Sequence, residues 1–114
     1  MIPFLDLKAQ HRALRAELLE AAGRVIDSCQ FALGNEVAAF EEEFASYCNA
    51  KYAAGVNTGT SALHLAFLAA GIGPGDEVIT VSHTFMASVS SIRYAGAKPV
   101  LVDIDPRTYT LDPA

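Results

Sequence analysis

From residue 51 onward, short apolar runs alternate with longer helical segments, and this alternation constrains the fold more than any other feature of the sequence. The runs at 51–57, 77–81 and 99–105 predict strands, and the segments 60–71 and 85–95 between them predict helices. Strands joined by helices of about a dozen residues form parallel sheets through right-handed crossovers. The sequence therefore predicts an α/β fold with the order β-α-β-α-β and a mostly parallel sheet.

Two helices are expected before this alternation begins. Apolar residues recur at intervals of three and four across 9–29, which indicates one face of an amphipathic helix. After the break that comes next, Asn35 is placed to cap a second helix, and Glu36 would lie near its positive end. We interpret the acidic run 41–43 as the solvated side of that helix, because aromatic side chains flank it.

The length of 114 residues fits one domain. We divide it into an N-terminal helical segment, 1–50, and the start of an α/β segment, 51–114. Near the end, Asp112 and Pro113 have the pattern of a helix N-terminus, yet the chain stops one residue later. We therefore expect this single domain to be incomplete; the alternative is an ordinary frayed tail.

Charge and hydropathy argue against several classes of function. The net charge of −5 disfavours a nucleic-acid partner, which calls for a basic surface. No apolar stretch approaches the ~18 residues of a membrane span, and the first residues lack the features of a signal peptide, so we expect a cytoplasmic protein with no membrane partner. Cys29 and Cys48 have no metal-binding spacing, and we expect no metal site.

The first predicted strand leads directly into small polar residues at the start of a helix. Ligands of open α/β sheets bind at the carboxyl ends of strands, and a helix N-terminus offers free amides and a partial positive charge. Gly59 would let a ligand approach the backbone, and Thr60 and Ser61 would add hydroxyl donors. We therefore consider a phosphate-binding turn, with an ordinary helix cap by Thr58 as the alternative; the local pattern leaves both open.

The second predicted strand ends at Ser82-His83-Thr84-Phe85. Large aromatic side chains are usually buried, so Phe85 is either a core residue or a stacking surface for a flat ligand. His83 could act as an acid or a base, but the sequence around it shows no paired carboxylate or nucleophile. The third predicted strand ends at Asp103-Ile104-Asp105-Pro106, which we interpret as a turn.

Taken in order, these segments resemble the N-terminal part of the DegT/DnrJ/EryC1/StrS family. This family consists of fold-type I pyridoxal-phosphate aminotransferases that act mostly on nucleotide-linked keto-sugars. The resemblance covers nearly the whole chain: IPFLDLKAQ matches the family's opening, and the block from FALGN to PVLVDID, which includes GVNTGTSALHL and SHTFMAS, matches the family's next block in order and spacing. It implies that the chain is part of the large domain of a fold-type I enzyme, with 51–114 as the start of the cofactor-binding domain.

The resemblance also implies a role for each candidate site residue. The turn Gly59-Thr60-Ser61 would hold the phosphate of pyridoxal 5'-phosphate, and Phe85 would stack on its pyridine ring. The implied reaction partners are a nucleotide-linked keto-sugar and an amino-acid amino donor. The family's usual homodimer agrees with a hydrophobic content of 52%, above the ~45–50% that is typical of soluble domains.

The catalytic group is expected outside these residues. Transamination needs a Schiff-base lysine and an acidic partner for the pyridine nitrogen. In the family, both lie well beyond the position at which this chain ends, and none of Lys8, Lys51 and Lys98 matches the position of the lysine. We therefore assign no catalytic residue, and we expect the chain to be inactive by itself.

The implied function is amino transfer in the biosynthesis of cell-surface polysaccharides or of secondary-metabolite sugars. Two alternatives stay open: part of a pyridoxal-phosphate-dependent sugar dehydratase of the same family, or a truncated, inactive remnant that binds phosphate or pyridoxal phosphate. A parallel sheet of three strands would leave an open edge and uncovered apolar faces, so we expect the chain alone to be poorly soluble or oligomeric.

Overall fold

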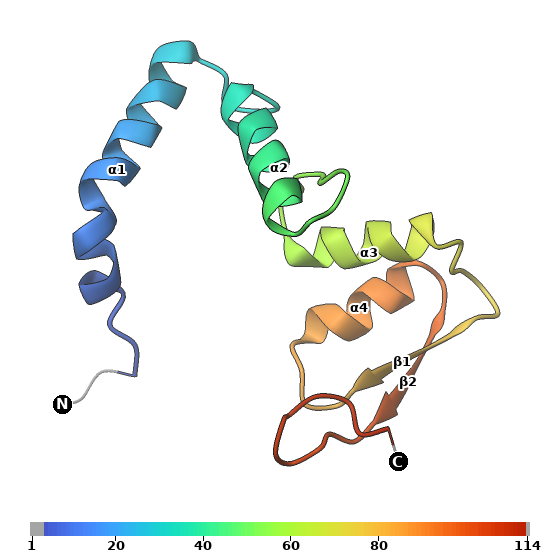
Figure 1. The fold of residues 1–114 in the computed structure, drawn as a ribbon. Helices are drawn as coiled ribbons and strands as arrows, with labels where there is room; N and C mark the ends of the chain where they lie inside the picture. Colours follow the sequence, from blue (N-terminus) through green and yellow to red (C-terminus); the bar gives the residue numbers. More distant parts are fainter. Residues whose placement is uncertain (1–3, 114) are drawn as a thin grey trace. The chain divides into compact units, whose positions relative to one another are not determined.

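The structure is a computed structural model that describes residues 4–113 (Figure 1). It divides the chain into two compact units, Met1–Gly55 and Val56–Ala114, each held together by its own contacts. The first unit contains helices α1 and α2, and the second contains α3, β1, α4 and β2. The α/β class is confirmed, and the expectation of a single domain stays a prediction. No helix among residues 4–113 is both long enough and apolar enough to cross a bilayer.

Helix α1 spans Leu7–Ser28 and confirms the long helix expected over 9–29. It begins earlier than expected because the Asp6 carboxylate accepts a hydrogen bond from the N–H of Ala9 at 3.1 Å. It ends at Cys29, whose φ of 53° lies in the left-handed region that terminates helices. No side chain of α1 is buried, so its apolar face is exposed within this unit.

Helix α2 spans Asn35–Tyr47, but the expected cap by Asn35 is wrong. Gly34 occupies the N-cap position, and no side chain of that residue can bond to the helix. Asn35 is the first helical residue instead, and its N–H donates to Oε1 of Gln30 at 3.0 Å. The cap comes from the Gln30 side chain outside the helix, a contact that residue spacing did not indicate.

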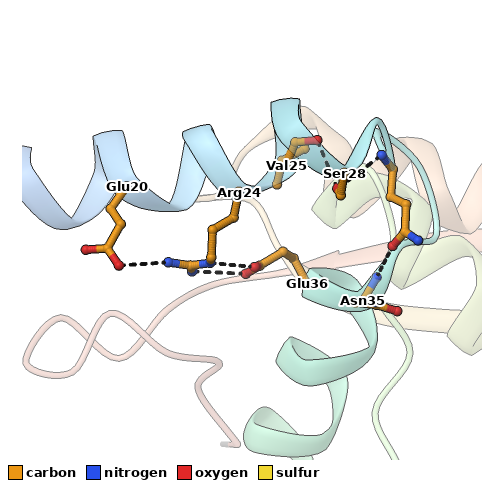
Figure 2. Close-up of polar contacts among 7 residues, drawn as sticks. Glu20, Arg24, Val25, Ser28, Asn35 and Glu36 are labelled. Atoms are coloured by element: carbon orange, nitrogen blue, oxygen red, sulfur yellow. Dashed lines mark hydrogen bonds and ion pairs between the residues drawn. The ribbon is translucent and has the colours of Figure 1, made fainter.

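An ion pair joins the two helices of the first unit (Figure 2). The Arg24 guanidinium donates to both carboxylate oxygens of Glu36, at 2.8 Å and 3.3 Å, and it also lies 3.5 Å from Glu20. The hydrogen bond from Arg24 and its positive charge hold the pKa of Glu36 below its ordinary value, and the same pair raises the pKa of Arg24. Both side chains are about half exposed, so the pair adds little stability and is sensitive to salt.

The acidic run in α2 is not entirely solvated. Glu42 and Glu43 are exposed, as expected, but Glu41 is half-buried and its carboxylate accepts a hydrogen bond from the N–H of Gly55 at 2.6 Å. The space beside Gly55 is narrow, because a Cβ there would lie 3.3 Å from Oε1 of Glu41. Glu41 is therefore a structural residue that holds the chain after α2 against the helix.

The strand expected at 51–57 is not formed. A strand exists only where its backbone pairs with a neighbour, and no segment among residues 4–113 forms a ladder with 51–57. The order in the second unit is therefore α-β-α-β, with a sheet of two strands rather than three. An apolar run predicts burial, but it carries no information about the pairing partner.

The two strands of the second unit confirm the expected parallel arrangement. Strand β1 spans Glu77–Val81 and β2 spans Lys98–Val102, and they pair in parallel with Glu77 opposite Lys98. The Lys98 ammonium lies 2.7 Å from the Glu77 carboxylate, which raises the pKa of Lys98. The register of the two strands places Glu77 and Lys98, their first residues, opposite each other, and the ion pair forms between these two side chains.

Helix α4 packs on this sheet, and α3 packs on α4. Helix α4 (Met86–Tyr94) connects the strands and packs against both, and α3 (Gly59–Ala69) packs against α4 (Figure 1). The helices predicted at 60–71 and 85–95 are thereby confirmed. The buried residues of this unit lie in α4 and in the turn after it: Ser91, Ile92, Ala95 and Ala97.

After β2 the chain makes the expected turn. The Arg107 side chain donates to the Asp105 carboxylate at 3.0 Å and the Arg107 N–H donates at 2.7 Å, and these bonds lower the pKa of Asp105. Ile104 and Leu111 then pair in an antiparallel bridge. The third strand is shorter than predicted because its ladder with β1 ends at Val102, opposite Val81. The helix predicted at the C-terminus extends into the last residue, which lies outside the described residues.

Candidate functional site

The first turn of α3 is capped by its own chain. Thr58 is the N-cap residue, with extended backbone, and its Oγ1 accepts a hydrogen bond from the N–H of Ser61 at 3.1 Å. The Thr58 carbonyl then accepts a bond from the N–H of Ala62 at 3.1 Å. The helix cap that the sequence suggested is thus confirmed.

This cap leaves two backbone amides unused. The N–H groups of Gly59 and Thr60 have no hydrogen-bond partner among residues 4–113, as is usual for the first positions of a helix. The backbone at Gly59 borders open space, because a Cβ built there would meet no atom within 4 Å. Unused amides beside open space at a helix N-terminus are suited to bind a phosphate group.

The structure distinguishes the two hydroxyls of this turn. The Ser61 hydroxyl donates to Oδ1 of Asn57 at 2.8 Å and accepts from the Thr58 hydroxyl at 3.1 Å, so its single proton is already used. The Thr60 hydroxyl has no partner within the described part of the chain, and Thr60 is only half-buried. Thr60 therefore has the side chain that is free to donate to a ligand.

Asn57 was not singled out from the sequence, although it shapes this turn. Its side chain reaches forward four residues and bonds to Ser61 across the start of α3. Asn side chains often bond to nearby polar groups at helix starts, so the spacing of Asn57 and Ser61 was the available signal. Asn57 holds the Ser61 side chain in one orientation.

Phe85 is exposed, which disfavours a core role. It is the N-cap residue of α4, and its relative exposure is 79%. Its ring contacts no other aromatic ring among residues 4–113. The ring is therefore available to stack against a flat ligand.

The two candidate features lie at one end of the second unit. Helices α3 and α4 pack against each other and start on the same side of the unit, the side toward which β1 and β2 point (Figure 1). The turn at 59–61 and Phe85 are both at these helix starts. Open α/β proteins bind ligands at this end of a parallel sheet. The structure thus brings together two features that the sequence separates by a helix and a strand.

The histidines of this unit have aromatic neighbours. The ring centre of His83, after β1, lies 6.0 Å from that of Tyr109, and the ring centre of His64 lies 5.9 Å from that of Tyr94. Neither histidine bonds to a carboxylate in the described range 4–113, so an acid–base role for His83 stays a hypothesis. These residues also contain no group of three or more His, Cys, Asp or Glu side chains that could hold a metal ion.

Amide donors, a free hydroxyl and an exposed aromatic ring can together hold a phosphorylated aromatic ligand. The fold and the candidate site define the class: an α/β protein whose candidate ligand-binding residues lie at the carboxyl end of a parallel sheet. Residues 12–114 match the DegT/DnrJ/EryC1/StrS aminotransferase family, and the chain belongs to this family.

Individual relatives and solved structures match nearly the whole chain. It is 52% identical over 112 residues to the dTDP-3-amino-3,4,6-trideoxy-alpha-D-glucose transaminase of Streptomyces venezuelae, a match that covers 98% of this chain and 30% of that protein. The crystal structure of S. venezuelae DesV in complex with a ketimine intermediate matches with a TM-score of 0.91 and 52% identity, over 98% of this chain and 30% of that one.

A solved structure with lower sequence identity has the same fold over nearly the whole chain. The structure of NtdA from Bacillus subtilis, with the cofactor PMP bound, matches with a TM-score of 0.90 and 30% identity, over 98% of this chain and 26% of that one. The chain therefore spans less than a third of the length of each of these proteins.

Proposed function

We propose that this chain belongs to a pyridoxal-phosphate-dependent aminotransferase that transfers an amino group from an amino acid to a nucleotide-linked keto-sugar. The observation that carries the proposal is the pair of unused amides at Gly59 and Thr60, at the same end of the unit as the exposed ring of Phe85. Family membership supports the reaction class. The similarity to a dTDP-sugar transaminase and to a structure with bound PMP supports the substrate class and the cofactor.

Each site residue has a separate task in this proposal. The amides of Gly59 and Thr60 and the Thr60 hydroxyl donate to the cofactor phosphate, aided by the positive end of α3. Ser61, whose N–H and hydroxyl are bonded to Thr58 and Asn57, keeps the turn in shape. Phe85 stacks on the pyridine ring and excludes water from one face of it.

The residues present fit the cofactor without supplying the chemical step. Pyridoxal phosphate, when bound, supplies an electron sink for the carbon next to the transferred amino group. The chain's own residues bind and orient it, and we assign none of them a catalytic role. The phosphate contacts fix the cofactor at one end and the Phe85 ring fixes its plane.

We also propose a cytoplasmic homodimer as the working form, with no nucleic-acid or membrane partner. Large apolar side chains are exposed along α1, among them Leu14, Leu18 and Ile26. Exposed apolar side chains of this kind support an interface with another protein surface. Sedimentation of the full-length protein tests the proposed homodimer, and a monomer at micromolar concentration contradicts it.

Titration of the full-length protein with pyridoxal phosphate tests the site. Thr60→Val removes a donor to a charged group, worth ~1.5–3 kcal/mol, so we expect the Kd to rise about ten- to hundredfold. Thr60→Ser keeps the hydroxyl and should bind nearly as well as the wild type. Phe85→Ala should also raise the Kd, whereas Phe31→Ala removes a similarly exposed ring from the other unit and should not. Unchanged affinity in both Thr60→Val and Phe85→Ala contradicts the proposed site.

The reaction has its own test. The full-length protein is incubated with pyridoxal phosphate, an amino acid and a nucleotide-linked keto-sugar, and the sugar product is analysed by mass spectrometry. We expect the keto oxygen to be replaced by an amino group. A product that has lost a hydroxyl group without gaining nitrogen points to a dehydratase and contradicts the proposal.

A further inference from the structure

Phe85 lies between two hydroxyl side chains that bond to each other. The Oγ1 of Thr84 and the Oγ of Ser88 are 2.9 Å apart, so one hydroxyl donates to the other across the start of α4. Phe85 itself is the N-cap residue, and a phenyl ring makes no capping bond. The hydroxyl pair satisfies no backbone amide; it links the residue before Phe85 to the first turn of α4.

The backbone on both sides of Phe85 is also anchored. The Thr84 N–H donates to the Ser82 carbonyl at 3.0 Å, and the Ser88 N–H donates to the Phe85 carbonyl at 3.0 Å. Together with the hydroxyl pair, these bonds hold the backbone on both sides of Phe85. They restrict the φ and ψ angles from which the Phe85 side chain projects.

The hydroxyl pair is connected to the core of the unit. Ser91 has a relative exposure of 0%, and its hydroxyl lies 2.7 Å from the carbonyl of Ala87 and 3.2 Å from that of Ser88. The first turn of α4 is thus joined to a buried side chain. Thr84, in the exposed loop, bonds to the Ser88 hydroxyl, and the Ser88 carbonyl accepts from the buried Ser91 hydroxyl.

The Phe85 ring has little else to hold it. It is 79% exposed and has no aromatic neighbour among residues 4–113. A ring that must stack on a ligand binds it more tightly when its direction is set before binding. The direction of this ring depends on the backbone to which it is attached.

We propose that Thr84 and Ser88 are positioning residues that hold Phe85 in the orientation for stacking on a flat ring. This inference rests on the proposed function, because it takes Phe85 to be the stacking surface. Neither hydroxyl needs to touch the ligand. Their effect on binding passes through Phe85.

Two ligands separate positioning from general damage to the site. Pyridoxal phosphate uses both the phosphate turn and Phe85, whereas inorganic phosphate uses the turn alone. In the full-length protein we expect Thr84→Val to raise the Kd for pyridoxal phosphate about fivefold, the effect of one lost hydrogen bond, and to leave the Kd for inorganic phosphate unchanged. Ser88→Ala should change the two Kd values in the same way, and Thr84→Ser, which keeps the hydroxyl, should bind pyridoxal phosphate as tightly as the wild type.

A double-mutant cycle shows whether the effect passes through the ring. In the Phe85→Ala background, Thr84→Val should cause no further loss of affinity, because the ring that it positions is absent. Additive effects overturn the inference, and so does equal weakening for both ligands, which indicates a general loss of structure.

The two proposals fail in different ways. If Phe85→Ala weakens binding and Thr84→Val does not, the positioning role is wrong and the stacking role stands. If Phe85→Ala leaves the affinity for pyridoxal phosphate unchanged, the stacking role is wrong and the positioning role falls with it.

Discussion

The hydroxyl oxygen of Thr58 accepts a hydrogen bond from the backbone N–H of Ser61 at 3.1 Å, so the third amide of α3 is satisfied by the chain itself. A cap by Thr58 and a phosphate-binding turn are alternatives when only the sequence is considered. The structure shows that they use different amides. The cap takes that of Ser61, and those of Gly59 and Thr60 stay unused. The cap therefore stabilises the turn at 59–61 and leaves free the two amides that the proposed site requires.

Removal of this cap should cost stability. Thr58→Ala deletes the acceptor for the Ser61 N–H, and such losses cost about 1 kcal/mol, so we expect the free energy of unfolding to fall by about that amount. Thr58→Ser keeps the oxygen and is the matched control. Urea unfolding of the full-length protein measures both. Equal stability of the alanine variant and the wild type would show that water replaces the cap.

Two glycines should respond to alanine in opposite ways. Gly96 has a φ of 86°, and a Cβ there would lie 3.0 Å from Cγ of Pro74, so Gly96→Ala should cost about 1–3 kcal/mol of stability. Gly59 has open space around it and no left-handed φ, so Gly59→Ala should raise the unfolding free energy of the ligand-free protein by about 0.4–1 kcal/mol. We expect it to weaken binding of pyridoxal phosphate, because the methyl group enters the space beside the unused amides. Tight binding by Gly59→Ala contradicts the proposed approach of the phosphate.

The two hydroxyls of the turn should differ in their effects. The Ser61 proton is used by Asn57, whereas the Thr60 hydroxyl has no partner within residues 4–113. Thr60→Val should therefore weaken binding of pyridoxal phosphate more than Ser61→Ala does, and Ser61→Ala should lower the thermal midpoint more. Calorimetric titration and thermal unfolding of both variants test this ranking. The reverse order for affinity would mean that Ser61 leaves Asn57 when the ligand binds.

The Arg24–Glu36 pair should make helix contacts in the first unit depend on pH. The bond from Arg24 lowers the pKa of Glu36 from its ordinary value of 4.5, so the pair stabilises the folded state above that pH. Its contribution falls as the pH drops through the lowered pKa, because the unfolded state then binds the proton more readily. Arg24 stays charged throughout this range.

Glu36→Gln tests this dependence. We expect the variant to lose less stability than the wild type between pH 5 and pH 3, and we expect added salt to reduce the difference between them. Thermal unfolding at each pH measures it. Glu42→Gln is the matched control, because Glu42 is an exposed carboxylate of the same helix with no ion pair among residues 4–113. Identical pH profiles for the wild type and Glu36→Gln would show that the pair contributes nothing.

Local patterns explain which parts of the fold were predicted well. Helix α1 follows from periodicity over successive turns, and α3, α4 and the parallel pair β1–β2 follow from the alternation of short apolar runs with helical segments. The cap of α2 was misplaced because the acceptor for the N–H of Asn35 is the Gln30 side chain, and the run at 51–57 was assigned to a strand because an apolar run does not reveal its pairing partner.

The sequence by itself determined the α/β class, the family and the positions of the candidate residues Gly59, Thr60, Ser61 and Phe85. These depend on residues close together in the chain, whose spacing and turn chemistry are visible without a structure. Only the tertiary structure decided that Phe85 is exposed and that its turn lies at the same end of the unit as the start of α3. Exposure and proximity depend on how elements pack, and packing brings together groups that the sequence keeps apart.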